Sequence, residues 1–159
     1  QLIKAFPDAR FNIDVKSDAA VEATCAVIED HGAVDRVCLA SFDHARLGRI
    51  RTRLPGVATA ASSREAALVK FLPAPILRLL RVPGAVVLQV PERRGFIRVV
   101  TGRFVQRAHR LGIQVHVWTV DDADSINRLL DLGVDGIITD RTDILKDVLV
   151  ARGTWREPQ

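Results

Sequence analysis

Near the C-terminal end of the chain, the spacing of apolar residues changes from that of a strand to that of a helix and back again. The pattern predicts a strand at Ile113–Val120, a short helix that begins at Asp121 and Asp122 and ends at Gly133, and a second strand at Gly136–Asp140. The apolar positions of the helix recur at helical spacing: Ala123, Ile126, Leu129 and Leu130. This order of elements predicts a βαβ unit with parallel strands.

The same alternation recurs along the whole chain. A helix is expected after each of these predicted strands: Arg10–Lys16, Val37–Phe42, Val57–Ala60, Ala85–Val90, Ile113–Val120 and Gly136–Asp140. Strict alternation admits an open doubly wound sheet or a TIM (β/α)8 barrel, both of the α/β class. The open sheet would place a glycine-rich loop after its first strand, and none is present here. Polar residues instead end several strands, as they do in a barrel: Lys16, Ser41, Gln89, Trp118 and Asp140.

Polar residues and prolines also mark the expected helix ends. We expect Ser17 or Asp18 to cap a helix that runs to about Asp30, and Asp43 to open the next helix, which stops at Pro55. The remaining helices are expected from Ser62 to the interruption at Pro73, from Arg98 to Leu111, and from Thr142 to Ala151. Asp140, just before the last helix, is expected to cap it or to support the site.

Basic residues outnumber acidic ones, with a formal net charge of +4 and a pI near 9.7. This favours a solvated surface, or attraction to an anionic substrate or a lipid surface. The arginines are scattered along helices without aromatic neighbours, which argues against nucleic acid as a partner. The apolar stretch Lys70–Arg81 is expected to be a helix that covers the core, with a lid or a lipid-facing surface as the alternative. Cys25 and Cys38 are expected to be reduced core residues.

The length of 159 residues predicts one domain, residues 1–159. A full TIM barrel needs eight units and typically ~250 residues. We therefore expect an incomplete barrel that lacks the first two βα units, because the polar tail has the character of a natural C-terminus and the chain contains no methionine. The missing N-terminal segment of the same protein is the expected partner of this chain. The sequence leaves the compartment open, with the cytoplasm favoured.

The first predicted strand carries the candidate chemistry. Its apolar residues share one face, and Asn12, Asp14 and Lys16 share the other. Buried without partners, these charges would cost several kcal/mol each, on the order of what isolated polar groups cost. The polar face must therefore open on a site, or the charges must pair, and a plain salt bridge between Asp14 and Lys16 is the simpler alternative.

Three phrases in this order carry a family resemblance: FNIDVK, SFDHARLGRIRTRLPGV and AHRLGIQVHVWTVDDADSINRLLDLGVDGIITDRTDIL. The chain resembles the glycerophosphodiester phosphodiesterases over nearly its whole length. The resemblance implies a TIM barrel, hydrolysis of small-molecule glycerophosphodiesters to glycerol 3-phosphate and an alcohol, and one divalent cation, Ca or Mg, as cofactor.

The resemblance also implies roles for single residues. Asp14 matches an acidic metal ligand, Lys16 matches a lysine that contacts phosphate, and Trp118 matches an aromatic residue that lines the substrate pocket. Gln89, the one polar residue of its strand, is expected to join them in binding substrate. Asp14 departs from the usual glutamate of the family and is one methylene shorter.

The larger departure is an absence. The family's His-Arg-Gly and Glu-x-Asp segments, which supply its catalytic residues and two of its metal ligands, do not occur in this sequence. The catalytic residues are therefore expected in the missing N-terminal segment, and the chain alone is expected to be inactive. Of the four histidines, only His116 is placed to face a barrel interior.

Two other functions stay open. One is a phospholipase D-like lyase that acts on choline phospholipids, suggested by the basic and apolar stretch after Lys70. The other is a non-catalytic binding barrel, suggested by the aspartate at position 14.

Overall fold

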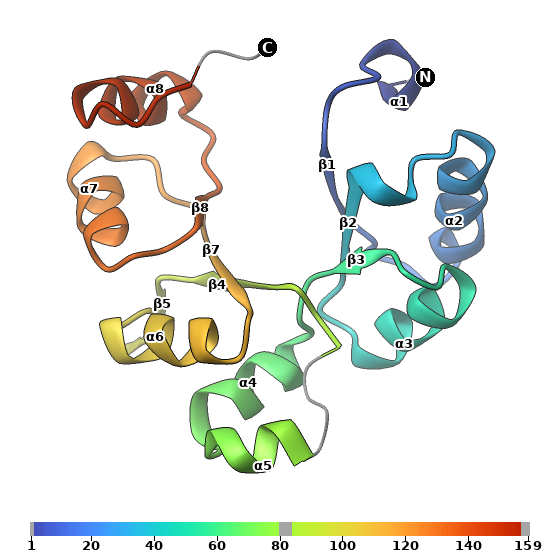
Figure 1. The fold of residues 1–159 in the computed structure, drawn as a ribbon, viewed down its shortest axis with the longest axis horizontal. Coiled ribbons are helices and arrows are strands. Elements are labelled where there is room, and N and C mark those ends of the chain that lie inside the picture. The colour runs from blue at the N-terminus through green and yellow to red at the C-terminus, as the bar shows by residue number, and fades with distance from the viewer. Residues whose placement is uncertain (1, 80–83, 157–159) are drawn as a thin grey trace. The chain divides into compact units, whose positions relative to one another are not determined.

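The computed structural model describes residues 2–79 and 84–156 and has an α/β fold in which strands and helices alternate (Figure 1). The chain divides into two compact units, Gln1–Val87 and Leu88–Gln159. Each unit is described by itself below. Within the described residues, no helix has both the length and the apolar character that crossing a membrane requires.

The first unit contains a parallel sheet in the order β1-β2-β3, with β1 at Phe11–Asp14, β2 at Val37–Ala40 and β3 at Ala58–Thr59. Asp14, the last residue of β1, is the register partner of Ala40, the last residue of β2. The helical elements of this unit are α1 (Leu2–Ala5), α2 (Ala20–Asp30), η1 (Val34–Arg36), α3 (His44–Arg53), α4 (Ser63–Phe71) and α5 (Ala74–Leu79).

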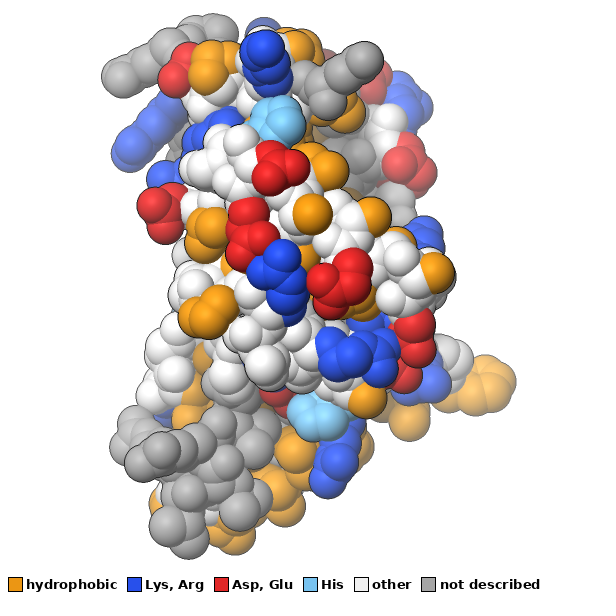
Figure 2. All heavy atoms as spheres, turned by 90° about the vertical axis from the view of Figure 1, so that its right-hand side faces the viewer, with side chains coloured by type: hydrophobic (Ala, Val, Ile, Leu, Met, Phe, Trp, Pro, Cys, Tyr) orange, Lys and Arg blue, Asp and Glu red, His pale blue; other side chains and the backbone are white. Residues whose placement is uncertain are grey.

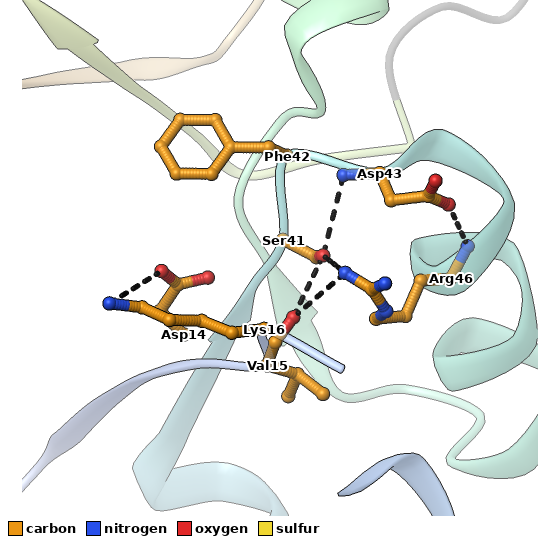
Figure 3. A pocket seen from close by; sticks show the side chains of 7 residues that line it. All are labelled: Asp14, Val15, Lys16, Ser41, Phe42, Asp43 and Arg46. Carbon is orange, nitrogen blue, oxygen red and sulfur yellow. Dashed lines mark hydrogen bonds and ion pairs between the residues drawn. The ribbon is translucent and has the colours of Figure 1, made fainter. Parts of the chain in front are cut away.

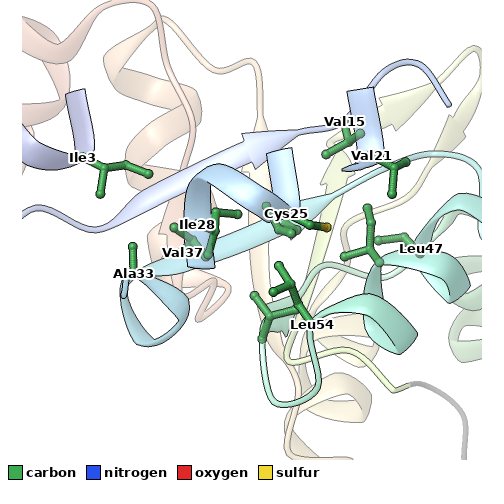
Figure 4. Packing of buried hydrophobic residues seen from close by; sticks show 12 residues of the cluster. Ile3, Val15, Val21, Cys25, Ile28, Ala33, Val37, Leu47 and Leu54 are labelled. Atoms are coloured by element: carbon green, nitrogen blue, oxygen red, sulfur yellow. The ribbon is translucent and has the colours of Figure 1, made fainter. Parts of the chain in front are cut away.

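The core of the first unit lies where α2 and α3 pack on β1 and β2 (Figure 4). Cys25, Leu39 and Leu47 are fully buried in it, and Val15 closes its end next to Lys16. Both cysteines are free, as expected, and burial raises the pKa of each thiol. This packing holds the C-terminal ends of β1 and β2 side by side.

Ion pairs join α2 and α3 on the outer face of the first unit. Arg53 contacts both Glu22 and Glu29, and Asp18 contacts both Arg46 and Arg49. The face that carries these helices shows acidic and basic side chains interspersed (Figure 2). The arginines of α3 therefore form a mixed, solvated surface and not a bare basic one.

The second unit contains a sheet in the order β4-β7-β8, with β4 at Val87–Pro91, β7 at Gln114–Trp118 and β8 at Gly136–Ile137. β7 and β8 are parallel. A separate two-stranded antiparallel hairpin, β5 (Arg93–Arg94) and β6 (Ile97–Arg98), directly follows β4. The helices are α6 (Gly102–Arg110), α7 (Ala123–Asp131) and α8 (Thr142–Ala151).

The structure confirms all of the predicted strands and most of the predicted helix starts. Asp43 caps α3 by accepting a hydrogen bond from the Arg46 backbone, and Asp122 caps α7 in the same way. Ser62 and Glu65 form a capping box at the start of α4. In each case the capping residue and its partner are three positions apart, so the sequence alone is enough to predict the helix start.

Two local predictions are wrong. Neither Ser17 nor Asp18 caps α2, because Ala19 occupies the N-cap position without a side-chain hydrogen bond and the Asp18 carboxylate binds arginines of α3. The helix expected from Arg98 begins only at Gly102, because the preceding residues form the hairpin and Thr101 supplies the cap. A third prediction is narrowed: Arg141 occupies the N-cap position of the last helix, so Asp140 is not the cap, and its role in supporting the site stays a prediction.

The stretch expected at Lys70–Arg81 is two helices, because α4 ends at Phe71 and α5 follows the proline at Pro73. Residues 80–83 lie outside the described residues, so the end of that prediction is not tested.

Candidate functional site

A pocket with a volume of about 590 Å³ lies at the C-terminal ends of β1 and β2 (Figure 3). The C-terminal ends of parallel strands are where α/β folds build their sites. The pocket is lined by Asp14, Val15, Lys16, Ser41, Phe42, Asp43 and Arg46. Two residues that were predicted for the site from sequence, Asp14 and Lys16, therefore lie together in one pocket of the first unit.

The side chains of Asp14 and Lys16 lie on the same face at the C-terminal end of β1 and line the open part of this pocket (Figure 3). The Lys16 Nζ atom lies 4.0 Å from Asp14 Oδ2, and the two side chains are 82% and 34% exposed. Exposed ion pairs of this kind contribute on the order of 0–1 kcal/mol. The pair does form, as the simpler alternative supposed, but it leaves both charged groups accessible to a ligand.

Ser41 forms the floor of the pocket and is buried. Its Oγ atom donates a hydrogen bond to the Val15 carbonyl oxygen (2.9 Å) and accepts one from Nη1 of Arg46 (3.0 Å). The hydroxyl thereby joins the segment after β2 to the end of β1. This bond holds the backbone immediately before Lys16.

Arg46, in the first turn of α3, also holds the segment after β2 against the end of β1. Its Nη1 atom also donates to the Val15 carbonyl oxygen (3.3 Å), and its Nε atom donates to Asp18 (2.7 Å). The hydrogen bond from Arg46, with the charge of Arg49, lowers the pKa of Asp18 despite partial desolvation. Because Arg46 already has these partners, its charge is largely used within the protein, and Lys16 is the pocket cation that remains available.

Phe42 gives the pocket an apolar side. Its side chain is 63% exposed and extends from the residue after Ser41 (Figure 3). An exposed phenyl ring beside a lysine and a carboxylate can contact the apolar part of a ligand whose charged part binds Lys16. Phe42 and Arg46 both belong to the phrase SFDHARLGRIRTRLPGV, but nothing local in the sequence shows that they line a pocket.

The residues present do not make a complete metal site. Among residues 2–79 and 84–156, no group of three or more histidine, cysteine or acidic side chains is close enough to hold a metal ion. Calcium takes six to eight oxygen ligands and magnesium is octahedral. Asp14 alone could therefore supply one ligand of such a site, and the described part of the chain does not supply the rest.

Gln89 and Trp118, the other two predicted substrate residues, belong to the second unit. Gln89 lies within β4 and Trp118 ends β7, and both side chains are partly exposed. Because each unit is described by itself, their roles in substrate binding stay predictions.

The His116 ring packs against the backbone of β8. Its ring lies so close over Gly136 that a Cβ atom at that glycine would be 2.6 Å from His116 Cδ2. Burial lowers the pKa of the imidazole, and Asp135 opposes this only in part. The glycine is required there because the histidine ring occupies the space, which favours a packing role for His116.

A second polar cluster follows β3. Glu65 is 4% exposed and receives a pair of hydrogen bonds from Arg51, at 2.7 and 3.2 Å. Arg51 also donates to Thr59 Oγ1, and the Ser62 backbone donates to Glu65. The Ser62 hydroxyl in turn lies 3.1 Å from Nδ1 of His44. The buried members, Thr59, Ser62 and Glu65, each have a partner within the cluster.

Comparison with known proteins identifies the family to which the chain belongs. The sequence model of the glycerophosphoryl diester phosphodiesterase family matches residues 2–144. A protein of Mycobacterium tuberculosis named probable glycerophosphodiester phosphodiesterase 2 is 44% identical over 161 residues, which cover 97% of this chain and 60% of that protein.

Solved structures show the same fold. A crystal structure from Silicibacter pomeroyi, named as a glycerophosphoryl diester phosphodiesterase, superposes with a TM-score of 0.78 at 26% identity and covers 98% of this chain and 56% of that one. A phosphodiesterase of Oleispira antarctica, solved with its product sn-glycerol-3-phosphate, has a TM-score of 0.68 at 17% identity and covers 89% and 55%. The chain thus spans little more than half the length of these relatives.

Proposed function

Because the chain belongs to the glycerophosphoryl diester phosphodiesterase family, we propose that the intact protein of which it forms part hydrolyses glycerophosphodiesters to glycerol 3-phosphate and an alcohol. The observation that carries this proposal is the open pocket in which Asp14 and Lys16 lie side by side. A phosphodiester is a small anion with an organic group on each side, and the pocket offers a free cation next to an apolar ring.

Lys16 is proposed to bind the phosphate. Water attacks phosphorus, the bond to the alcohol oxygen breaks, and negative charge builds on the phosphoryl oxygens before the alcohol takes up a proton. An ammonium group beside those oxygens stabilises the transition state more than the ground state. Lys16 suits this role because its side chain is exposed and held only by the 4.0 Å contact with Asp14 among the described residues.

Arg46 is proposed as a positioning residue. It holds the Val15 carbonyl oxygen, Ser41 and Asp18 at once, and therefore fixes the segment on which Lys16 stands. Lysine has a flexible side chain, and fixing the backbone beneath it is expected to increase its affinity for the ligand, since less conformational entropy is lost on binding.

Asp14 is proposed to supply one oxygen ligand to a divalent cation. When bound, such a cation would polarise a phosphoryl oxygen. The remaining ligands are proposed to come from residues outside this chain, since the described residues do not complete the site. Calcium and magnesium are both suited to carboxylate oxygen.

We further propose that these 159 residues form six of the eight units of a single TIM-barrel domain, and that Gln89 and Trp118 contact substrate in the intact protein. The acid–base groups are then supplied by the remaining units. On this proposal the chain alone is inactive.

Product analysis tests the proposed function. The intact protein, incubated with a glycerophosphodiester and a divalent cation, is expected to release glycerol 3-phosphate. A cyclic phosphate product would instead identify the lyase alternative, and no turnover of any phosphodiester would favour the binding barrel. Turnover by the purified 159-residue chain would overturn the proposal that the catalytic groups lie outside it.

A further inference from the structure

The hairpin after β4 has an unusual composition for a surface turn. Arg93 pairs with Arg98 across the two strands, and Arg94 pairs with Ile97. Gly95 has a positive φ of 58°, as the first residue of a two-residue hairpin turn requires, and Phe96 follows it at the tip. The phenyl ring at the tip is fully exposed, with a relative accessibility of 104%, and Ile97 is 60% exposed.

Three of the hairpin side chains contribute little to the fold. Phe96 buries no apolar surface, so its exposure to water is not offset by packing. Within the described residues, Arg93 and Arg94 are exposed and form no salt bridge with an acidic side chain. An anionic partner would pair with these two arginines, and an apolar partner would cover the ring.

We propose that the β5–β6 hairpin docks on an anionic lipid surface, with Phe96 and Ile97 inserted among the acyl chains and Arg93 and Arg94 at the headgroups. Aromatic and aliphatic residues flanked by basic ones are the composition of elements that bind the membrane interface. Arginine stems lie along the apolar boundary while their guanidinium groups remain at the phosphates. The positive net charge of the chain acts in the same direction.

The small size of the hairpin favours lipid over a protein partner. A stable protein interface buries about 800 Å² on each side, contributed by roughly twenty or more residues. The exposed hairpin consists of six residues, Arg93 to Arg98, and its apolar part is one ring and one isoleucine. Shallow insertion into a bilayer needs no complementary groove and no larger contact area.

The chain provides a matched control for this idea. Phe71, at the end of α4, is also exposed (72%) and also has a basic neighbour, because Lys70 Nζ lies 5.9 Å from its ring centroid. It differs in standing at a helix end without a flanking group of arginines. If any exposed phenylalanine near a cation were enough, Phe71 would serve as well as Phe96.

Co-sedimentation of the intact protein with vesicles tests the proposal. The protein is expected to bind vesicles of phosphatidylcholine mixed with phosphatidylglycerol, and to bind pure phosphatidylcholine much more weakly. Phe96→Ser is expected to reduce partitioning by about tenfold, the value of burying one aromatic side chain. Arg93→Gln and Arg94→Gln are each expected to reduce it by about fivefold, and added salt is expected to reduce the binding of the wild type.

Phe71→Ser is expected to bind as the wild type does, and thermal unfolding of Phe96→Ser is expected to match the wild type because the ring is fully exposed. The proposal is overturned by any of three results. Phe96→Ser binds anionic vesicles as well as wild type, Phe71→Ser loses as much vesicle binding as Phe96→Ser, or the wild-type protein does not bind anionic vesicles. The last result would leave a protein partner as the reason for the exposed ring. The measurement does not involve turnover, so its outcome is independent of the proposed phosphodiesterase activity.

Discussion

Two polar clusters follow strand ends in the first unit, and they differ in nearly every physical respect. The β1–β2 cluster comprises Asp14, Lys16, Ser41 and Arg46, and the β3 cluster comprises Arg51, Thr59, Ser62 and Glu65. In the β1–β2 cluster the outer pair is exposed and 4.0 Å apart. In the β3 cluster, Glu65 is buried and receives two hydrogen bonds, at 2.7 and 3.2 Å, from the partly buried Arg51.

The difference separates a binding site from a structural connection. In the β3 cluster the polar groups satisfy one another, so no capacity is left for a ligand. In the β1–β2 cluster, Ser41 and Arg46 are satisfied, but they hold the backbone of two residues whose charges stay available. Polar residues at strand ends are therefore informative about function only once their burial and their partners are known.

The largest expected effect concerns the β3 cluster. Glu65→Ala leaves the guanidinium of Arg51 without its carboxylate partner. It is expected to lower the free energy of unfolding by about 3 kcal/mol, the lower end of the range for breaking a buried pair, because Arg51 is 24% exposed and keeps Thr59 as a partner. Chemical denaturation of the chain measures this loss. Glu29→Ala, which removes the exposed Glu29–Arg53 pair between α2 and α3, is the matched control and is expected to cost only a small part of it.

The double change Arg51→Met with Glu65→Leu removes both charges together. It is expected to recover much of the stability, since apolar residues of similar size replace buried pairs well. If Glu65→Ala unfolds at the same denaturant concentration as Glu29→Ala, the two clusters do not differ as described.

The second prediction concerns the β1–β2 cluster, where a change is expected to affect activity and not stability. In the intact protein, Lys16→Met is expected to lower kcat by about 100-fold or more, the size of effect seen when one group that stabilises transition-state charge is removed. Thermal stability is expected to stay unchanged, because the lysine side chain is 82% exposed. Steady-state kinetics and thermal unfolding of the same preparation measure both quantities.

Lys4→Met, which removes an exposed lysine of α1, is the control and is expected to leave both quantities at wild-type values. Full activity of Lys16→Met would mean that the phosphate binds elsewhere. A large fall in its melting temperature would mean that Lys16 belongs to the framework and not to the open site.

The smallest expected effect is in the pH dependence of stability. Burial alone raises the pKa of Glu65, but the hydrogen bonds from Arg51 and the Ser62 backbone, with the charge of Arg51, bring it below its ordinary value of 4.5. A carboxyl whose pKa is lower in the folded state stabilises the fold above its ordinary pKa, and this stabilisation is lost as the pH falls through the folded-state value.

Glu65→Gln cannot titrate, so its stability is expected to fall less steeply than that of wild type as the pH drops below about 4.5, the ordinary value. Denaturation at a series of pH values measures the slope. Asp30→Asn removes an exposed carboxyl and controls for the change in net charge. Identical slopes for wild type and Glu65→Gln would contradict a depressed pKa for Glu65.

Local signals made part of this structure predictable. The strands follow from the two-residue period of β-branched and apolar residues, and the caps of α3, α4 and α7 follow from residues three positions apart. The polar face of the first strand also identified Asp14 and Lys16 as neighbours, because alternate strand residues point the same way.

Long-range contacts account for the errors. Asp18 had the local signature of a cap, but Arg46 and Arg49, which lie 28 and 31 positions later, compete successfully for its carboxylate. The β5–β6 hairpin was not predicted, and its last residue, Arg98, was expected to begin the next helix, since two-residue strands are too short to show a period. Phe42 and Arg46 gave no local sign that they line a pocket with Lys16.

By itself, the sequence determined the order of strands and helices, most of the helix starts, and the pair of charges at the end of β1. Each of these depends on residues within about four positions of one another, where the backbone geometry is already set by the element. Only the tertiary structure decided which polar cluster is closed and which is open. The packing of α3 places Arg51 on Glu65, whereas Asp14 stays exposed beside Lys16.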